Sequence, residues 1–571
     1  MSSLPDRIQP SQIHQLHSPL SEIAVPKASG GPALDSSAAL LAVLNQALER
    51  VVALGALVGV GVCAGALAVR LMRDRDLRWT WSLVPLAVLL PAGPLSPLSH
   101  GWAAAFGVAS LYAAADGRRR HRDDLAAGGD LAERAGTRSG PTALLRGASL
   151  ELAARCADRP RRVPARIKDG RLEVGRDESA RPVCVPFGEG GGRHTLVVGA
   201  TGSGKTVTQT WMVCRAIEAG LAAVVVDPKG DRRMRDALAL AARGCGHRFL
   251  EWTPLGPTVY NPLARGGASE IADRALAGER FTEPHYLRQA QRYLGHAVRT
   301  LQGAGMAASF PSLVELLEPG RLELLSEAVA GKQGHRTREY LASLTARQRA
   351  DLGGVRDRLA ILAESDMARW LDPAMAGEGA LDAGTFDLLG AIAERAVVYF
   401  CLQADSWPLL AQMLGAAVIG DLRSAMAALQ RRPVATVAAI DEFAAIAAEQ
   451  VAHLFGRARS AGINLVLGTQ ELSDLRVDGR GQLREQVLGN LSGLIAHRQV
   501  VADSVQLVSE LGGSVGAWRT SRSSDGRWTQ TRVQVPAISA ERVRALPPGV
   551  AAVIDLADCA PVRLARVHMC G

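Results

Sequence analysis

Residues 194–213 read HTLVVGATGSGKTVTQTWMV and decide the fold. A β-branched run is followed by a glycine-rich turn and then by a helical pattern. Gly199, Gly204, Lys205 and Thr206 satisfy GxxxxGK[ST], in which backbone amides and a helix N-terminus cradle phosphates. We therefore predict an ATP site with Lys205 at the β- and γ-phosphates and Thr206 on Mg²⁺. The predicted nucleotide-binding loop consists of Gly199, Ala200, Thr201, Gly202, Ser203, Gly204, Lys205 and Thr206.

The next apolar run, Leu221–Val226, is typical of a parallel strand buried on both faces. It ends in the polar sequence DPKGD, and polar residues at the carboxyl end of such a strand lie on the ligand edge of the sheet. Only five of the 65 basic residues are lysine, so a lysine indicates a need for a compact ammonium. We predict that Asp227 and Lys229 contact the nucleotide. A purely structural turn is the alternative.

A further buried strand is predicted near Pro433, where VATVAAIDEF ends in two acids. This arrangement lets Asp441 hold Mg²⁺ while Glu442 activates the attacking water. A hydrophobic strand ending in two acids is common by chance. Its combination with the phosphate loop makes it the predicted Walker B strand.

The segment INLVLGTQ from Ile463 predicts another strand, with Gln470 at its carboxyl end. We expect Gln470 to sense the γ-phosphate and to bond the attacking water, although a simple polar turn is the alternative. Upstream, FGRARSAG places Arg457 and Arg459 near a helix end. Either is a candidate arginine finger for a neighbouring subunit, against the alternative of ordinary surface arginines.

The amino-terminal region has a membrane pattern. Residues 1–50 are polar and predict a flexible tail, whereas 51–69 carry no charge and are long enough for a transmembrane helix. A second uncharged run, 80–115, contains three prolines, so the region 51–115 is predicted to span the membrane two or three times. The basic cluster at 118–122 places the following residues in the cytoplasm, which predicts a multi-pass protein of the bacterial cell membrane with a cytoplasmic ATPase. A buried hydrophobic hairpin is the alternative.

Composition narrows the class of protein. A chain of 571 residues predicts three or four domains, and aromatic residues at 4% favour an aliphatic α/β core. The net charge of +9 is a weak indication of an anionic partner such as nucleic acid or membrane lipid. The eight cysteines show no CxxC pair, which favours reduced thiols over a zinc site.

Together, GATGSGKT, DPKGD, the NPL at 261–263, IDEF and the strand ending in GTQ resemble the TraG/TraD-type coupling proteins of conjugation, which are type IV secretion ATPases and relatives of the FtsK/HerA motors. The resemblance covers about residues 45–120 and 180–560. The segment 488–513 also fits, as a strand followed by a helix that ends in Gly512 and Gly513.

The resemblance implies an α/β fold: a RecA-like P-loop NTPase domain with an inserted all-α domain and N-terminal transmembrane helices. The motor is expected over 166–269 and 386–571, after a basic linker at 116–165. The insertion is expected over 270–385, where periodicity predicts amphipathic helices. These helices are expected at 284–303, 311–329 and 347–370.

The resemblance also implies a function. We expect a homo-hexamer that hydrolyses ATP. We expect it to bind single-stranded DNA independently of sequence and to pump this DNA, with its bound relaxase, into a type IV secretion channel. The chain shows no long acidic tail after the motor, which leaves partner recognition open. The alternatives are a protein-exporting secretion ATPase, an FtsK-like chromosome translocase and a membrane scaffold that binds ATP without hydrolysis. An ABC transporter is disfavoured because LSGL, at 491–494, follows the Walker B strand.

Overall fold

The computed structural model describes residues 167–570, except 179, 189, 280, 282, 377–383, 477–481, 523–527 and 559, and helical pieces within 41–67 and 107–115. The chain divides into two units, 1–126 and 127–571. In the amino-terminal unit, residues 41–49 of the predicted tail are helical, and every described residue within 41–67 is exposed. Most of the predicted spans, and the whole linker at 116–165, lie outside the described residues.

The larger unit is built on one mixed sheet of eleven strands in the order β2-β1-β15-β14-β11-β3-β10-β9-β4-β8-β5. The seven strands from β11 to β5 are parallel, and β14, β15, β1 and β2 extend the sheet in antiparallel fashion. The strands of this sheet are β1 (Arg171–Arg176), β2 (Pro182–Pro186), β3 (Thr195–Val198), β4 (Ala222–Asp227), β5 (Phe249–Trp252), β8 (Val397–Cys401), β9 (Thr436–Ile440), β10 (Ile463–Thr469), β11 (Gly493–Ala496), β14 (Val550–Asp555) and β15 (Ala560–Val567).

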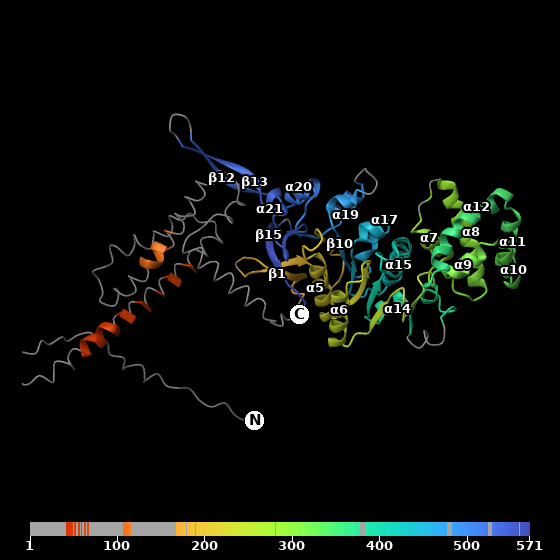
Figure 1. Cartoon of the computed structure of the whole chain (residues 1–571), viewed down its shortest axis with the longest axis horizontal. Helices are drawn as coiled ribbons and strands as arrows, with labels where there is room; N and C mark the ends of the chain where they lie inside the picture. Colours follow the sequence, from red (N-terminus) through yellow and green to blue (C-terminus); the bar gives the residue numbers. More distant parts are fainter. Residues whose placement is uncertain are drawn as a thin grey trace, which may run out of the picture. The chain divides into compact units, whose positions relative to one another are not determined.

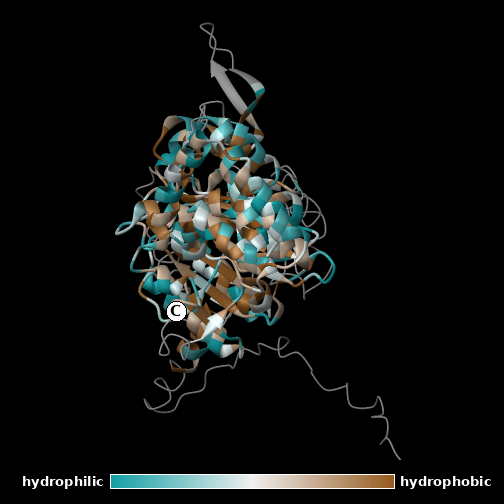
Figure 2. Cartoon of the chain, turned by 90° about the vertical axis from the view of Figure 1, so that its right-hand side faces the viewer, coloured by the Kyte–Doolittle hydropathy of each residue, from teal (hydrophilic) through white to brown (hydrophobic). Residues whose placement is uncertain are grey.

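The central strands are buried on both faces, as their continuous apolar runs predicted. Successive residues of β3 pack into opposite layers, because Val197 belongs to one buried cluster whereas Leu196 and Val198 belong to the other. Figure 2 shows these interior strands in brown, with teal more frequent on the covering helices. Helices α5 (Lys205–Glu218) and α6 (Arg232–Gly244) cover one face. The other face carries α14 (Leu388–Ala393), α15 (Pro408–Leu429), α16 (Phe443–Ile446), α17 (Ala448–Ala452), α18 (Phe455–Ala458) and α20 (Ala502–Leu511).

Helix α15 is 22 residues long and largely apolar and, among the described helices, meets the length and hydropathy of a membrane span. However, 72% of its most apolar window is buried inside the protein. It packs against α7, α14 and α16 in the larger hydrophobic cluster. We therefore assign α15 to the core of the motor.

A helical domain interrupts the sheet between β5 and β8. Its entry and exit are joined by a short parallel pair of strands, β6 (Val259–Tyr260) and β7 (Thr385–Phe386). Figure 1 shows its helices grouped to one side of the sheet. They are α7 (Ala268–Leu276), α8 (Pro284–Gly303), α9 (Phe310–Leu316), α10 (Pro319–Ala328), α11 (Lys332–Ala342), α12 (Ala346–Ala363) and the 3₁₀ turn η3 (Ala368–Trp370).

The helix predicted at 284–303 is confirmed by α8, and two other predictions are corrected. The helix predicted at 311–329 is two helices, because Pro319 disfavours helical backbone at Glu318 and starts α10 at its own N1 position. The helix predicted at 347–370 ends at Ala363, and η3 follows it as a separate turn.

Between β10 and β11 lie η4 (Leu472–Leu475) and α19 (Gln482–Gly489). After β11 the chain leaves the sheet and forms α20, the hairpin β12–β13 (Ser514–Arg522 and Trp528–Pro536) and α21 (Ala540–Arg544). It returns to the sheet in β14. Helix α20 ends with Gly512 as its C-cap, and Gly513 has a φ of 74°, which confirms the predicted helix end. The hairpin projects from the sheet in Figure 1. It was not predicted.

Candidate nucleotide site

The phosphate loop connects β3 to α5 at the carboxyl edge of the parallel strands. Gly202 and Gly204 have φ of 75° and 110°, a left-handed region that favours glycine. Helix α5 begins at Lys205 without a side-chain cap and without an acid in its first turn. The amides of its first turn therefore remain available for an anion, at the positive end of the helix dipole.

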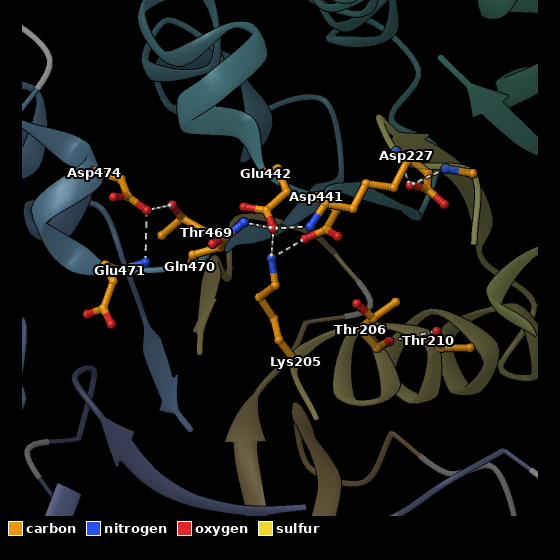
Figure 3. Close-up of polar contacts among 12 residues, drawn as sticks. Lys205, Thr206, Thr210, Asp227, Asp441, Glu442, Thr469, Gln470, Glu471 and Asp474 are labelled. Carbon is orange, nitrogen blue, oxygen red and sulfur yellow. Dashed lines mark hydrogen bonds and ion pairs between the residues drawn. The ribbon is translucent and has the colours of Figure 1, made fainter. Parts of the chain in front are cut away.

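The predicted catalytic groups converge beside this loop, from elements more than 200 residues apart. The Lys205 ammonium lies 2.9 Å from Asp441 Oδ1 and 2.7 Å from Glu442 Oε1. Gln470 donates its amide to the same Glu442 oxygen over 3.1 Å. Figure 3 shows Lys205 pointing from the start of α5 toward the two carboxylates at the end of β9.

Charge and burial set the protonation of the two acids. Burial raises the pKa of Asp441 above its usual range, against the opposing effect of Lys205. Burial would also raise the pKa of Glu442, but Lys205 and Lys229 outweigh it and lower that pKa. Glu442 is therefore the acid held more firmly as a carboxylate. Its backbone is left-handed, with a φ of 45°, a strained conformation often found at functional sites.

The DPKGD turn is held together by its first residue. The carboxylate of Asp227 accepts from the amides of Lys229, Gly230 and Asp231 and from the hydroxyl of Tyr399. Both oxygens of Asp227 therefore have two donors within the fold, as the structural alternative requires, and its contact with nucleotide stays a prediction. The Lys229 ammonium lies 2.9 Å from Glu442 Oε1. It contacts the predicted catalytic acid directly.

Gln209, a further polar residue at this edge, was missed in the sequence analysis. With its amide nitrogen facing the acid, Gln209 donates to Asp441 Oδ1 over 3.0 Å and accepts from the Gly468 amide over 3.2 Å. Gln209 follows Lys205 by four residues and so shares its helix face, a spacing visible in the sequence. A Cβ at Gly468 would lie 2.4 Å from Asp441 Oδ1, so the glycine of GTQ permits this approach.

The end of β11 also reaches the site. Gln499 donates to the carbonyl of Gln470 over 3.0 Å and so fixes the backbone of that residue. His497 lies behind the phosphate loop, with Nε2 2.9 Å from the Thr208 hydroxyl. Both follow the apolar run GLIA, and the rule that polar residues ending a strand lie on the ligand edge could have identified them.

Arg457 and Arg459 do not join this cluster. Both are exposed and lie at the end of α18, immediately before β10 begins. Gln470 follows the other end of β10, and seven residues of strand span about 23 Å. The structure therefore separates the two arginines from the phosphate loop of their own subunit.

The residues present fit a nucleotide with Mg²⁺. An uncapped helix start, a loop with left-handed glycines and a lysine provide the donors for phosphate oxygens. Thr206 and Asp441 supply the hard oxygens that Mg²⁺ prefers, together with phosphate and water. Within the described part of the chain no three His, Cys, Asp or Glu side chains form a metal cluster, so the phosphates would complete the coordination.

Comparison with protein families gives two matches. Residues 435–548 match the family described as the TraM recognition site of TraD and TraG. Residues 172–234 match the central domain of the helicase HerA. The first match includes Asp441, Glu442 and Gln470, and the second includes the phosphate loop. No curated protein sequence matches the chain.

Solved structures show the same fold. The bacterial conjugative coupling protein TrwB, in its unbound form lacking 70 amino-terminal residues, is 18% identical with a TM-score of 0.51, over 74% of this chain and 91% of TrwB. TrwB with ADP and Mg²⁺ gives the same identity and score over 74% and 92%. TrwB with a non-hydrolysable ATP analogue is 17% identical with a TM-score of 0.51. With the two family matches, this shared RecA-like fold confirms the resemblance to the TraG/TraD-type coupling proteins.

Proposed function

We propose that this chain is a membrane-anchored ATPase that couples DNA, with its bound relaxase, to a type IV secretion channel during conjugation. The single observation that carries the proposal is the convergence of Lys205, Asp441, Glu442 and Gln470 at one sheet edge. This edge belongs to a chain whose carboxy-terminal region matches that of TraD and TraG. The complexes of TrwB with ADP and Mg²⁺ and with an ATP analogue support ATP as the nucleotide.

Each site residue has a proposed task. The amides of the 199–206 loop and Lys205 bind the phosphates, and Thr206 and Asp441 hold Mg²⁺, which supplies charge neutralisation when bound. Glu442, which its lowered pKa keeps as a carboxylate, orients and deprotonates the attacking water. Gln470 contacts Glu442 and reports the state of the site along β10. Lys229 keeps Glu442 in place.

The anchor and the assembly belong to the same proposal. The uncharged segment 51–69 supports a transmembrane helix, and its described residues are exposed apolar side chains. The position of Arg457 and Arg459, far from their own phosphate loop, supports a ring in which one of them reaches the neighbouring subunit's nucleotide. We take a homo-hexamer as that ring.

ATPase activity of the detergent-purified full chain tests the proposal. Single-stranded DNA should stimulate hydrolysis more than double-stranded DNA or an unfolded polypeptide, and the stimulation should weaken steeply with salt. The Glu442→Gln variant should bind ATP but lose activity by about 10²–10⁴-fold. Stimulation by the polypeptide alone would indicate a protein-exporting ATPase, and undiminished activity in Glu442→Gln would contradict the catalytic assignment.

Mixing experiments test the ring. If an arginine acts in trans, Arg459→Ala or Arg457→Ala subunits that are inactive alone should regain activity when mixed with Glu442→Gln subunits. In such mixed rings, the intact Glu442 of an arginine-variant subunit faces the intact arginine of a neighbouring Glu442→Gln subunit. Absence of any recovery for both arginines would exclude them as fingers.

A further inference from the structure

An imidazole lies against the back of the phosphate loop. His497 directly follows β11 and is fully buried. A Cβ at Gly199 would lie 2.8 Å from His497 Cβ, and a Cβ at Gly204 would lie 3.3 Å from its Cε1. The first and last glycines of the loop thus face the same side chain. His497 therefore determines how closely the loop approaches β11.

The hydrogen bonds of this imidazole are directional. The Thr208 hydroxyl donates to the carbonyl of Gly204 over 3.2 Å, so its oxygen is left to accept from His497 Nε2 over 2.9 Å. Burial lowers the pKa of His497 to about 4, which keeps the ring neutral. The backbone carbonyls of Ser203 and Val550 also act on the ring and partly oppose the effect of burial on its pKa. The neutral imidazole thus joins β11 to the first turns of α5.

The same loop is held at two other points by the carboxy-terminal region. The Ala200 amide donates to the carbonyl of Arg498 over 3.0 Å, and the Gly549 amide donates to the carbonyl of Ser203 over 2.9 Å. Residues 498 and 549 bracket α20, the β12–β13 hairpin and α21. Both ends of this carboxy-terminal excursion, residues 498–549, are therefore bonded to the phosphate loop.

We propose that His497 is a positioning residue of the phosphate loop and that it links nucleotide binding to the carboxy-terminal excursion. It holds Thr208, one turn into α5, so that the first amides of the helix keep the orientation that phosphate requires. Movement of the loop is transmitted to residues 498 and 549 through their backbone bonds. The inference rests on the nucleotide site proposed above and assigns it a control surface in the TraD- and TraG-like region.

Two amide substitutions at position 497 test whether the nitrogen at the position of Nε2, rather than the volume of the ring, is required. The amide nitrogen of glutamine at position 497 falls near the position of Nε2, whereas that of asparagine falls near Nδ1. The test measures binding of a fluorescent, non-hydrolysable ATP analogue to the detergent-purified full chain. We expect His497→Gln to bind close to the wild type and His497→Asn to bind about 5–10-fold more weakly, the effect of one buried hydrogen bond. Melting temperature without nucleotide reports on folding.

Thr208→Val provides the matched variant on the other side of the contact. It should weaken binding by the same factor, and adding His497→Asn to it should cause no further loss, because the two changes remove one interaction. Equal binding by wild type and His497→Asn, or additive losses in the double variant, would overturn the proposal. If the wild type itself fails to bind the analogue, the proposed nucleotide site fails instead.

Hydrogen exchange tests the link to the excursion. The analogue should slow exchange of the amides at 498–501 and 549–550 in the wild type and in His497→Gln. In His497→Asn, saturated with analogue, this protection should be reduced. No response at either end of the excursion in the wild type would overturn the proposed link.

Discussion

The nucleotide site and the base of the helical domain each contain a buried cation between polar partners, but the two cations differ. At the nucleotide site, Lys205 is bonded to two carboxylates. At the base of the helical domain, Arg274 donates through Nη1 to the carbonyls of Pro262 and Arg265 and to Asp421. Arg274 has a side-chain exposure of 1%, and Tyr260 donates to the other oxygen of Asp421.

The difference shows what each cation is for. A guanidinium whose Nη1 meets three fixed acceptors is suited to remaining in place. An ammonium on a flexible stem can leave one set of acceptors for another, and Lys205 lies within reach of both the carboxylates and the phosphate loop. In a chain with so few lysines, a lysine at the nucleotide site provides a cation that can exchange the carboxylates for phosphate.

The largest expected effect is at the fixed cation. Arg274→Met leaves Asp421 buried without its cation, and such a break costs about 3–5 kcal/mol of the free energy of unfolding. Arg274→Lys should recover only part of this, since one ammonium cannot replace both the contacts of Nη1 and the ion pair that Nη2 makes with Glu270 over 3.5 Å. Urea unfolding of the two variants measures the effect. Full stability in Arg274→Lys would remove the distinction between the two sites.

The converse substitution should act on activity. In Lys205→Arg the charge is kept, but a planar fork replaces the compact ammonium that contacts both carboxylates. We expect ATP hydrolysis to fall by about 10²–10³-fold, similar to the loss of one preorganised donor to the reacting phosphate. The melting temperature should change little. Retention of more than a tenth of wild-type hydrolysis would show that a mobile ammonium is unnecessary.

Asp421 gives the base of the helical domain a pH dependence. Burial raises the pKa of Asp421 to about 6, despite the opposing effects of Arg274 and Tyr260. The folded state binds this proton more tightly than the unfolded chain, where the pKa is about 3.9. The stabilisation is therefore complete below about pH 4 and is lost as the pH rises to about 6. The stability of wild type relative to Asp421→Asn should fall by about 3 kcal/mol across that range, as followed by urea unfolding.

The smallest expected effect is at Lys229, whose side chain is 47% exposed and whose ammonium lies 2.9 Å from Glu442 Oε1. Lys229→Met should lower kcat about tenfold and leave the affinity for the ATP analogue unchanged, because the contact is with the acid and not with the loop. Lys229→Arg should restore part of kcat. A weakened affinity with unchanged kcat would return Lys229 to the phosphate-binding role that the sequence predicted.

The parallel strands and the edge of the site were predictable because each is a continuous apolar run that ends in polar residues. This pattern placed Lys205, Asp441, Glu442 and Gln470 on one edge before any contact was known. The same pattern after β11 would have identified His497 and Gln499. The nucleotide contact of Asp227 stays a prediction, because a strand-end carboxylate can bond its own turn as readily as a ligand.

The antiparallel extension of the sheet was not predictable in the same way. Strands β1 and β15 pair across nearly 400 residues, and neither is a continuous apolar run. Partner choice between such strands depends on the finished sheet and not on local sequence. The ion pairs of Lys205 were not predictable either. The motif indicates that the lysine binds the phosphates when nucleotide is present, but not which groups it contacts when nucleotide is absent.

The helical domain starts and ends at one point, where two residues of β6 pair with two of β7. The whole insertion is therefore a closed loop on the sheet. Its two ends are separated by the distance between paired strands, about 4.8 Å. The entropy of closing a flexible loop grows only with the logarithm of its length, about 0.6 kcal/mol for each doubling. A helical domain of another size or shape can thus replace this one between β6 and β7 with little change in the folding free energy of the motor.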